Sequence, residues 1–260
     1  MTIVQSLWIG SDLGTMERLC INSFLKHGYE YHLYVYEDIQ NIPSGVIIKD
    51  ANEIVDKSEV FTYNNKSFSA ISNLFRFTLL YKKGGWWVDT DMVCTQYYDD
   101  TNDKYLFTSE SNKKYNENKI NAGIIKMPIG DPILLEAVQR CQEAKEKILK
   151  GEIVWGVGPS TVKFLVEKYQ LEKYVKPWTF ANSCSGHHFR TIIDTSFDTS
   201  KDKTLKGFEL RYFNHLNQRP MNNYFIHLWN EHWRKNEIDK EAQYPEDCLY
   251  EQLKKLYSSE

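Results

Sequence analysis

The chain opens with alternating strand and helix signals, and this order constrains the fold more than any other feature. Residues 3–9 are rich in β-forming side chains and run into the turn Gly10-Ser11-Asp12. Residues 15–27 carry apolar side chains at helical spacing, and Gly28 stands where a helix C-cap belongs. Residues 31–36 return to a strand pattern. A β-α-β order predicts a parallel sheet with a right-handed crossover.

Length and charge bound the remaining architecture. The 260 residues suit one large α/β domain or two small ones, and 42% apolar residues predict a globular core. No internal repeat or Gly/Ser-rich linker marks a boundary, so we expect a single domain over residues 1–260 with a C-terminal helix at about 245–257. The net charge of -3 provides no global basic field, which excludes a nucleic-acid binding role.

The cysteines and the absence of targeting segments indicate a cellular location. The five cysteines are scattered, odd in number and without zinc-site spacing, so we expect reduced and mostly buried thiols. The N-terminus lacks the pattern of a signal peptide, and no apolar run reaches the length of about 18 residues that a transmembrane helix needs. We therefore expect a cytoplasmic protein without a transmembrane segment, and we leave peripheral membrane association open.

Two carboxylates follow a strand in the middle of the chain. Residues 66–83 predict a helix that ends at Gly84-Gly85, and the strand 86–88 then runs into Asp89 and Asp91. Side chains two apart in an extended segment share a face, so these carboxylates can converge on one cation. Magnesium or manganese there would bridge diphosphate oxygens and neutralise charge on a departing nucleotide diphosphate. A bare D-x-D pattern is also typical of a solvated strand end.

The helix before these carboxylates carries a polar stripe. Ser69, Asn73 and Arg76 share one face amid apolar side chains. Buried polar groups need partners. Arg76 therefore has two interpretations, an ion pair with a core carboxylate or a contact with a nucleotide-sugar.

The middle of the chain resembles the DXD-containing sugar transferases of glycosyltransferase family 32. The resemblance is carried by the run from Ser72 to Arg76, by Leu80-Tyr81 and by residues 84–91 (GGWWVDTD). This region is shared with capsular polysaccharide transferases, initiating mannosyltransferases, α-1,4-galactosyltransferases and clostridial glucosylating toxins. Relatives typically carry Ser-Asp-x-x-Arg on the helix, so Asn73 departs from the family pattern.

Further segments resemble the family in the same chain order. Residues 5–10 resemble the opening strand that lines the nucleotide base pocket, and residues 121–125 resemble the Asn-Ala-Gly strand beside the donor sugar. Residues 226–233 resemble the C-terminal His-x-Trp-Asn element with its downstream Trp. Residues 156–160 resemble a Gly-Pro segment on the acceptor side and lack the ending of a P-loop. Residues 187–188 are a His pair with two interpretations, acceptor contacts or surface loop.

The resemblance implies a GT-A type α/β fold, with a mostly parallel central sheet flanked by helices and the site outside the carboxyl ends of the strands. It implies a retaining, metal-dependent glycosyltransferase that moves a hexose from a nucleotide-sugar to a hydroxyl of a saccharide or lipid-linked saccharide. A UDP-α-hexose is favoured over GDP-mannose as donor, and surface or capsular polysaccharide synthesis is the expected context.

The resemblance also implies three sets of site residues. The catalytic set is Asp89, Asp91 and Arg76. The metal set, for Mn²⁺ or Mg²⁺, is Asp91, Asp89 and His227, and a histidine nitrogen beside two carboxylates suits manganese at least as well as magnesium. The donor-binding set is Trp8, Ile9, Asn73, Arg76, Asp89, Asn121, Ala122, Asn230 and Trp233.

Two other function classes fit parts of the sequence. Residues 89–93 fit the D-x-D-x-[T/V] nucleophile motif of haloacid dehalogenase-like phosphatases. That motif normally ends the first strand, whereas here it follows about ninety residues, and the later Lys and Gly-Asp-x-x-x-Asp elements are missing. A catalytically silent protein that binds a nucleotide-sugar is the third interpretation.

Overall fold

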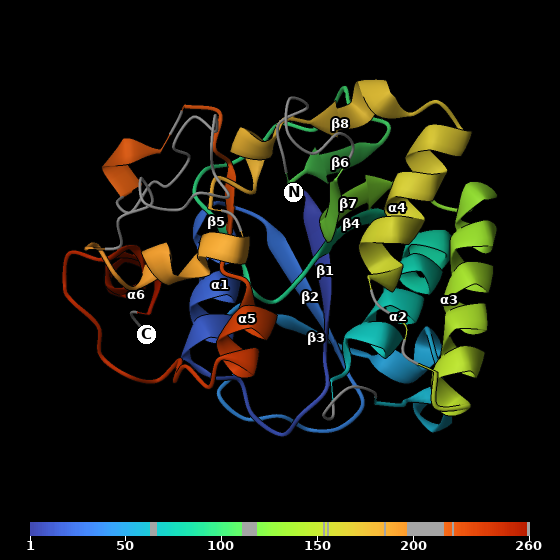
Figure 1. Cartoon of the computed structure of the whole chain (residues 1–260), viewed down its shortest axis with the longest axis horizontal. Helices are drawn as coiled ribbons and strands as arrows, with labels where there is room; N and C mark the ends of the chain where they lie inside the picture. The colour runs from blue at the N-terminus through green and yellow to red at the C-terminus, as the bar shows by residue number, and fades with distance from the viewer. Residues whose placement is uncertain are drawn as a thin grey trace.

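A seven-stranded sheet forms the centre of the molecule, in the order β3-β2-β1-β4-β7-β6-β8 (Figure 1). The computed structural model describes residues 1–62, 67–110, 119–152, 154, 156–184, 186–196, 216–219 and 221–258. The strands of this sheet are β1 (Ile3–Trp8), β2 (Glu30–Val35), β3 (Ile47–Asp50), β4 (Gly85–Val88), β6 (Leu106–Ser109), β7 (Ile120–Met127) and β8 (Val175–Lys176). A second sheet pairs β5 (Met92–Cys94) with β9 (Phe225–His227).

The central sheet is mostly parallel. Strand β1 pairs in parallel with both β2 and β4, and β2 pairs in parallel with β3. Strand β7 is the exception, because it runs antiparallel to both β4 and β6. The predicted β-α-β opening is confirmed, since α1 (Thr15–Lys26) connects the parallel neighbours β1 and β2.

Helices cover both faces of the sheet (Figure 1). Helices α2, α3 and α4 pack on one face, and α1 packs on the other with α6 beside it. The helices are α1 (Thr15–Lys26), α2 (Ser69–Lys83), α3 (Ile133–Leu149), α4 (Val157–Lys168), α5 (Asn230–Lys235) and α6 (Leu249–Tyr257). Short 3-10 helices complete the described elements: η1 (Ala51–Glu53), η2 (Lys57–Glu59), η3 (Glu172–Tyr174), η4 (Trp178–Phe180), η5 (Gly186–Ile192) and η8 (Leu216–Gln218). The predicted α/β class, with a mostly parallel central sheet flanked by helices, is confirmed.

Alternation of side chains along the strands divides the core between these two faces. Leu7 of β1 and Trp87 of β4 belong to the cluster under α2, α3 and α4. Val4 and Trp86, on the same two strands, belong to the cluster on the α1 face. A third cluster joins α1 to the C-terminal elements. The five cysteines are buried and free, as predicted.

Two glycines end α2 and start the strand that carries the carboxylates. Gly84 has a φ of 66°, and a β-carbon there would lie 2.5 Å from the backbone nitrogen of Ile129. Only glycine fits both the left-handed conformation and this close approach. Gly85 then begins β4, which runs between β1 and β7 to Asp89. None of the helices in the described part of the chain is both long enough and apolar enough to cross a membrane.

Candidate active site

The D-x-D motif forms a turn between the two sheets. Asp89 follows β4, and its carbonyl accepts a hydrogen bond from the Met92 amide at 3.0 Å. The expectation of an extended Asp89–Asp91 segment was wrong, because the chain turns here to leave the central sheet and pair with β9. The two carboxylates consequently have different partners.

Asp89 is paired with the arginine of α2. Its Oδ1 accepts hydrogen bonds from Arg76 Nη2 at 2.5 Å and from Trp87 Nε1 at 2.7 Å. Arg76 is almost fully buried, its Nη1 donates to Asn73 Oδ1 at 2.9 Å, and its guanidinium lies 5.0 Å from the centre of the Trp87 ring. Arg76 therefore forms an ion pair, but its partner is a carboxylate of the motif itself rather than a core carboxylate, and a contact with a nucleotide-sugar stays a prediction.

Asp91 is held by the C-terminal segment. Its Oδ2 accepts the backbone N–H of Asn230 at 2.8 Å and lies 3.3 Å from His227 Nε2. Burial by itself would raise the pKa of the Asp91 carboxyl, but the charge and hydrogen bond of His227 and the Asn230 amide outweigh burial and hold this pKa below its ordinary value. Burial likewise would lower the pKa of His227, and the Asp91 charge raises it above its ordinary value.

Long-range backbone pairing brings His227 and Asn230 to this place. Met92 lies opposite His227 in the β5–β9 ladder, and the Leu228 amide donates to the Asp91 carbonyl at 2.9 Å. Trp229 then adopts a left-handed conformation with a φ of 62°, which turns the chain into α5 at Asn230. The Trp229 ring stacks on the His227 ring at 3.8 Å between centroids.

The first residues of β7 line the space between the two carboxylates. Asn121 Nδ2 lies 2.9 Å from Glu110 Oε1 and 3.3 Å from His227 Nδ1, and Asn121 Oδ1 accepts the Gly123 amide at 2.5 Å. A β-carbon on Gly123 would lie 3.2 Å from Asp89 Oδ2. Glycine at this position therefore keeps the space open.

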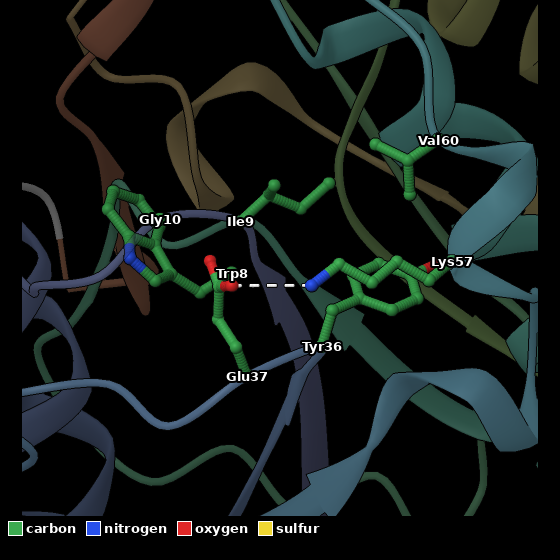
Figure 2. Close-up of a pocket in the computed structure, with 7 residues that line it drawn as sticks. All are labelled: Trp8, Ile9, Gly10, Tyr36, Glu37, Lys57 and Val60. Carbon is green, nitrogen blue, oxygen red and sulfur yellow. Dashed lines mark hydrogen bonds and ion pairs between the residues drawn. The ribbon is translucent and has the colours of Figure 1, made fainter.

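A cavity opens at the same edge of the sheet. Parallel strands β1 and β4 are aligned with Gln5 opposite Trp87, so both end at the edge that carries Asp89. The cavity has a volume of about 120 Å³ and is lined by Trp8, Ile9, Gly10, Tyr36, Glu37, Lys57 and Val60. Figure 2 shows the Trp8 ring on one side and the Lys57 side chain reaching across to Glu37, with Nζ and Oε2 3.3 Å apart.

Two predicted donor-binding residues lie in the core. Ala122 points away from its neighbours on β7 and packs in the cluster under α2, α3 and α4. Trp233 is fully buried, its Nε1 donates to the Leu228 carbonyl at 2.8 Å, and its ring packs against Tyr250. The structure therefore does not bring either side chain to the carboxylates.

Residues 156–160 and the His pair 187–188, which the sequence associated with the acceptor, lie in different elements of the fold. Gly158 lies in the first turn of α4, where a β-carbon would overlap Asn73 Oδ1 and approach Arg76 Nη1 to 3.2 Å. The start of α4 thus packs directly on the polar stripe of α2. His188 is buried, with 4% of its surface exposed, and the His187 side chain lies outside the described residues.

The donor atoms of the two aspartates fit a hard cation. The contacts with Arg76, Trp87, Asn230 and His227 engage Asp89 Oδ1 and Asp91 Oδ2, so Asp89 Oδ2 and Asp91 Oδ1 lie outside these contacts. These two oxygens are the ligands that Mg²⁺ or Mn²⁺ prefers. The same part of the chain contains no preformed group of three or more His, Cys, Asp or Glu side chains arranged around a metal position.

Three residues near the site were not predicted from the sequence. Glu110 follows β6 in a charged stretch and belongs to no recognisable motif. Glu37 and Lys57 lie twenty positions apart with no motif between them. Only the fold brings them to the site, so no local pattern could have revealed them.

Comparison with known proteins gives a family match for the N-terminal part of the chain. Residues 14–108 match the family model "Glycosyltransferase sugar-binding region containing DXD motif". A comparison with curated proteins gave no significant match. Solved structures that this chain is similar to include the PaToxG glycosyltransferase, at 16% identity and a TM-score of 0.47 over 65% of this chain and 69% of that one.

Two further solved structures are similarly distant. The apo form of the glycosyltransferase GlyE of Streptococcus pneumoniae TIGR4 is 13% identical, with a TM-score of 0.48 over 92% of this chain and 64% of GlyE. The galactosyltransferase LgtC, in complex with donor and acceptor sugar analogues, is 12% identical, with a TM-score of 0.43 over 87% of this chain and 86% of LgtC. The family match covers residues 14–108 of the 260 and includes Arg76, Asp89 and Asp91.

Proposed function

We propose that this glycosyltransferase moves a hexose from a UDP-α-hexose to a hydroxyl of a saccharide or lipid-linked saccharide, with retention of anomeric configuration. The observation that carries the proposal is the placement of three groups at one sheet edge: the Arg76–Asp89 pair, the His227–Asp91 pair and the cavity beside Trp8. Surface or capsular polysaccharide synthesis in the cytoplasm is the proposed context, with peripheral membrane association for a lipid-linked acceptor.

The cavity beside Trp8 suits the base of the donor. Its volume of about 120 Å³ is well below the roughly 300 Å³ at which pockets for larger ligands begin. A single flat base beside the Trp8 indole is therefore the proposed occupant, and UDP is the proposed carrier.

Asp89 and Asp91 would hold the divalent cation through Asp89 Oδ2 and Asp91 Oδ1. When bound, Mg²⁺ or Mn²⁺ supplies Lewis acid stabilisation of the diphosphate leaving group. Arg76 orients Asp89, and as a buried cation it also favours negative charge developing nearby. Asn230 and His227 fix Asp91 from the opposite side.

Retention is proposed to occur on one face of the sugar, without a covalent enzyme intermediate. The bond from the anomeric carbon to the diphosphate oxygen breaks, the acceptor oxygen bonds to the same carbon, and the acceptor proton passes to the released diphosphate. Each site carboxylate has a basic partner: Arg76 for Asp89, His227 for Asp91 and Lys119 for Glu110. These partners lower the nucleophilicity of the three carboxylates, which favours a mechanism without a covalent intermediate.

Donor binding and hydrolysis test this proposal. We expect UDP with Mn²⁺ or Mg²⁺ to raise the melting temperature, because a ligand that binds only the folded state stabilises it, and EDTA to remove the effect. Asp91→Asn should abolish metal-dependent hydrolysis of UDP-hexoses, whereas Asp99→Asn, the same charge change at an exposed turn, should not. NMR of the released sugar should show the α-anomer first. A shift with GDP alone would refute the base assignment, and a β-anomer would refute retention.

The same assay separates the other function classes. Hydrolysis of simple phosphate esters without a sugar donor would support the phosphatase interpretation, which the engagement of Asp89 Oδ1 by Arg76 and Trp87 disfavours. A metal-dependent thermal shift with UDP-hexoses but no turnover with any acceptor or water would support a silent binding protein.

A further inference from the structure

A second cavity lies at the opposite end of β1 from the candidate active site. Its volume is about 340 Å³, which falls in the size range of small-molecule sites that begins at roughly 300 Å³. Ile3 and Gln5 line this cavity, whereas Trp8, at the carboxyl end of the same strand, lines the cavity at the catalytic edge. An extended strand spans about 16 Å from residue 3 to residue 8, so the two cavities are separate.

The second cavity is a corner of the sheet face that carries α2. Side chains two apart on a strand share a face, so Gln5 lies on the same face as Leu7, which packs under α2. The strand register adds His32 opposite Gln5 and Lys49 opposite Tyr34 to that face. The last turn of α2 and the 3-10 helix η1 border this corner, and both contribute lining residues.

Hydrogen bonds and burial fix the floor of this cavity. Gln5 is buried, and its Nε2 donates to the carbonyls of Gly84 at 2.8 Å and Trp86 at 3.2 Å. Both bonds use the amide nitrogen, so the amide oxygen lies outside them and can accept from a ligand. Burial and the nearby charge of Glu53 raise the pKa of Tyr34, so its hydroxyl stays protonated and can both donate and accept.

The rim of the cavity is also held in place. Lys82 Nζ donates to the carbonyls of Glu53 and Ile54, both at 2.9 Å, and these bonds tie η1 to the end of α2. Glu53 Oε2 in turn lies 3.7 Å from Lys83 Nζ, which is the next residue of the same helix. The cavity is therefore formed by connected elements before any ligand binds, which lowers the entropy cost of binding.

The charges around the cavity largely cancel. Lys83 is paired with Glu53, and His32 Nε2 lies 2.6 Å from Glu30 Oε1. Lys49 adds a positive charge to the lining. An anionic ligand would meet the two carboxylates as well as the lysines, and a cationic ligand would meet the lysines. A neutral ligand rich in hydroxyls is better matched, because each hydroxyl can donate to Glu53 or accept from Lys49.

We propose that this cavity is a second saccharide site, which binds a neutral oligosaccharide through its hydroxyls and is separate from the catalytic edge. Ile3, with 40% of its surface exposed, supplies an apolar contact for the C–H groups of a sugar ring. A glycan held here would raise the effective concentration of its chain near the catalytic edge. This consequence rests on the proposed function, whereas the binding itself needs neither donor nor metal.

Two glycine amides report on the two regions separately. Gly85 lines the second cavity and is the one glycine in the sequence that follows a glycine, and Gly123, beside Asp89, is the one that follows an alanine. Labelling with ¹⁵N-glycine and with carbonyl-¹³C glycine or alanine therefore assigns each amide. Titration with lactose and with maltose, without nucleotide or metal, should shift the Gly85 resonance saturably in the millimolar range and leave Gly123 nearly unchanged. No saturable shift of Gly85 with either disaccharide, or a shift of Gly123 alone, would overturn the proposal.

Two substitutions with matched controls test the contacts. Tyr34→Phe removes one hydroxyl and Lys49→Met removes one ammonium group, and each should weaken disaccharide binding about fivefold, the factor expected for one hydrogen bond. Tyr169→Phe and Lys163→Met make the same changes in and directly after α4, outside the cavity, and should leave the affinity unchanged. Wild-type affinity in both cavity variants would refute the assignment.

Inorganic phosphate tests the class of ligand. Titrated in the same way, phosphate should bind more weakly than the disaccharides, because the carboxylates around the cavity oppose an anion. Tighter binding of phosphate would refute a site for neutral saccharides. Because these spectra need neither nucleotide nor turnover, a protein without transfer activity would still show the site, and the two proposals can fail separately.

Discussion

Replacing Gly123 by alanine tests whether the groups around it form one closely fitted site. The new β-carbon would lie 2.8 Å from Asn121 Oδ1, 3.2 Å from Asp89 Oδ2 and 3.5 Å from His227 Cε1. The first distance is shorter than β-carbon contacts in folded proteins, so the Asn121 amide must move. The φ of Gly123 lies outside the left-handed region, and the backbone therefore accepts alanine without strain.

The expected magnitude follows from this local overpacking. Forcing extra carbon into a packed site costs about 1–3 kcal/mol. A domain of this size loses roughly 2–4 °C of melting temperature per kcal/mol, so we expect a fall of about 4–8 °C for a cost near 2 kcal/mol. Displacement of Asp89 and Asn121 should also weaken UDP binding in the presence of Mg²⁺ by about tenfold or more, which corresponds to about 1.4 kcal/mol.

Thermal unfolding and isothermal titration with UDP and Mg²⁺ measure the two effects separately. Gly130→Ala is the matched control, because its β-carbon meets no atom within 4 Å but its φ of 68° makes alanine strained. We expect it to lose about 1–2 kcal/mol of stability and to bind UDP normally. Wild-type affinity in Gly123→Ala would refute the close fit of the site.

Three further substitutions extend these expectations. Gly84→Ala should destabilise the protein by roughly 3 kcal/mol or more in urea unfolding, because its β-carbon would meet the Ile129 backbone and its φ disfavours alanine; near-wild-type stability would refute the close approach. Arg76→Leu should cost about 3 kcal/mol by leaving a partly buried carboxylate unpaired, and a loss below about 1 kcal/mol would show that the pair is loosely formed. Because the pKa of Asp91 is held below its ordinary value, the stabilisation from its charge is present above about pH 4, near the unfolded pKa, and is lost as the pH falls through the folded pKa. Asp91→Asn should therefore show a smaller loss of unfolding free energy between about pH 6 and 3, and an identical acid profile would contradict the shift.

The sequence predicted the elements that depend on local patterns. The helix that became α2, the Gly84 turn and the strand leading to Asp89 were all recognisable, because apolar periodicity and glycine conformation act over a few residues. The helical pattern also showed that Arg76 needs a partner, which left two interpretations: an ion pair with a carboxylate or a contact with a nucleotide-sugar. Its place on a buried helix stripe required a partner, but only the fold could show that the partner is Asp89.

The shape of the motif itself could not be predicted in this way. The rule that side chains two apart share a face applies to a continuous strand, whereas Asp89 and Asp91 flank a turn into another sheet. That turn exists because β5 pairs with β9, more than a hundred residues later in the chain. No feature near Asp91 reveals such a distant partner. Trp233 was predicted to bind the donor because it is close in sequence to His227. The fold instead buries its ring against Tyr250.

The long-range pairing of β5 with β9 also divides the site into two parts with different origins. Arg76 and Asp89 lie within the family match, and their contacts come from α2 and β4, which adjoin in sequence. The partners of Asp91 lie beyond residue 108 and depend on the C-terminal segment closing against the motif. A loss of β5–β9 pairing would therefore release Asp91 while leaving the Arg76–Asp89 pair in place. The geometry of the two motif carboxylates is thus set by tertiary folding rather than by the D-x-D spacing.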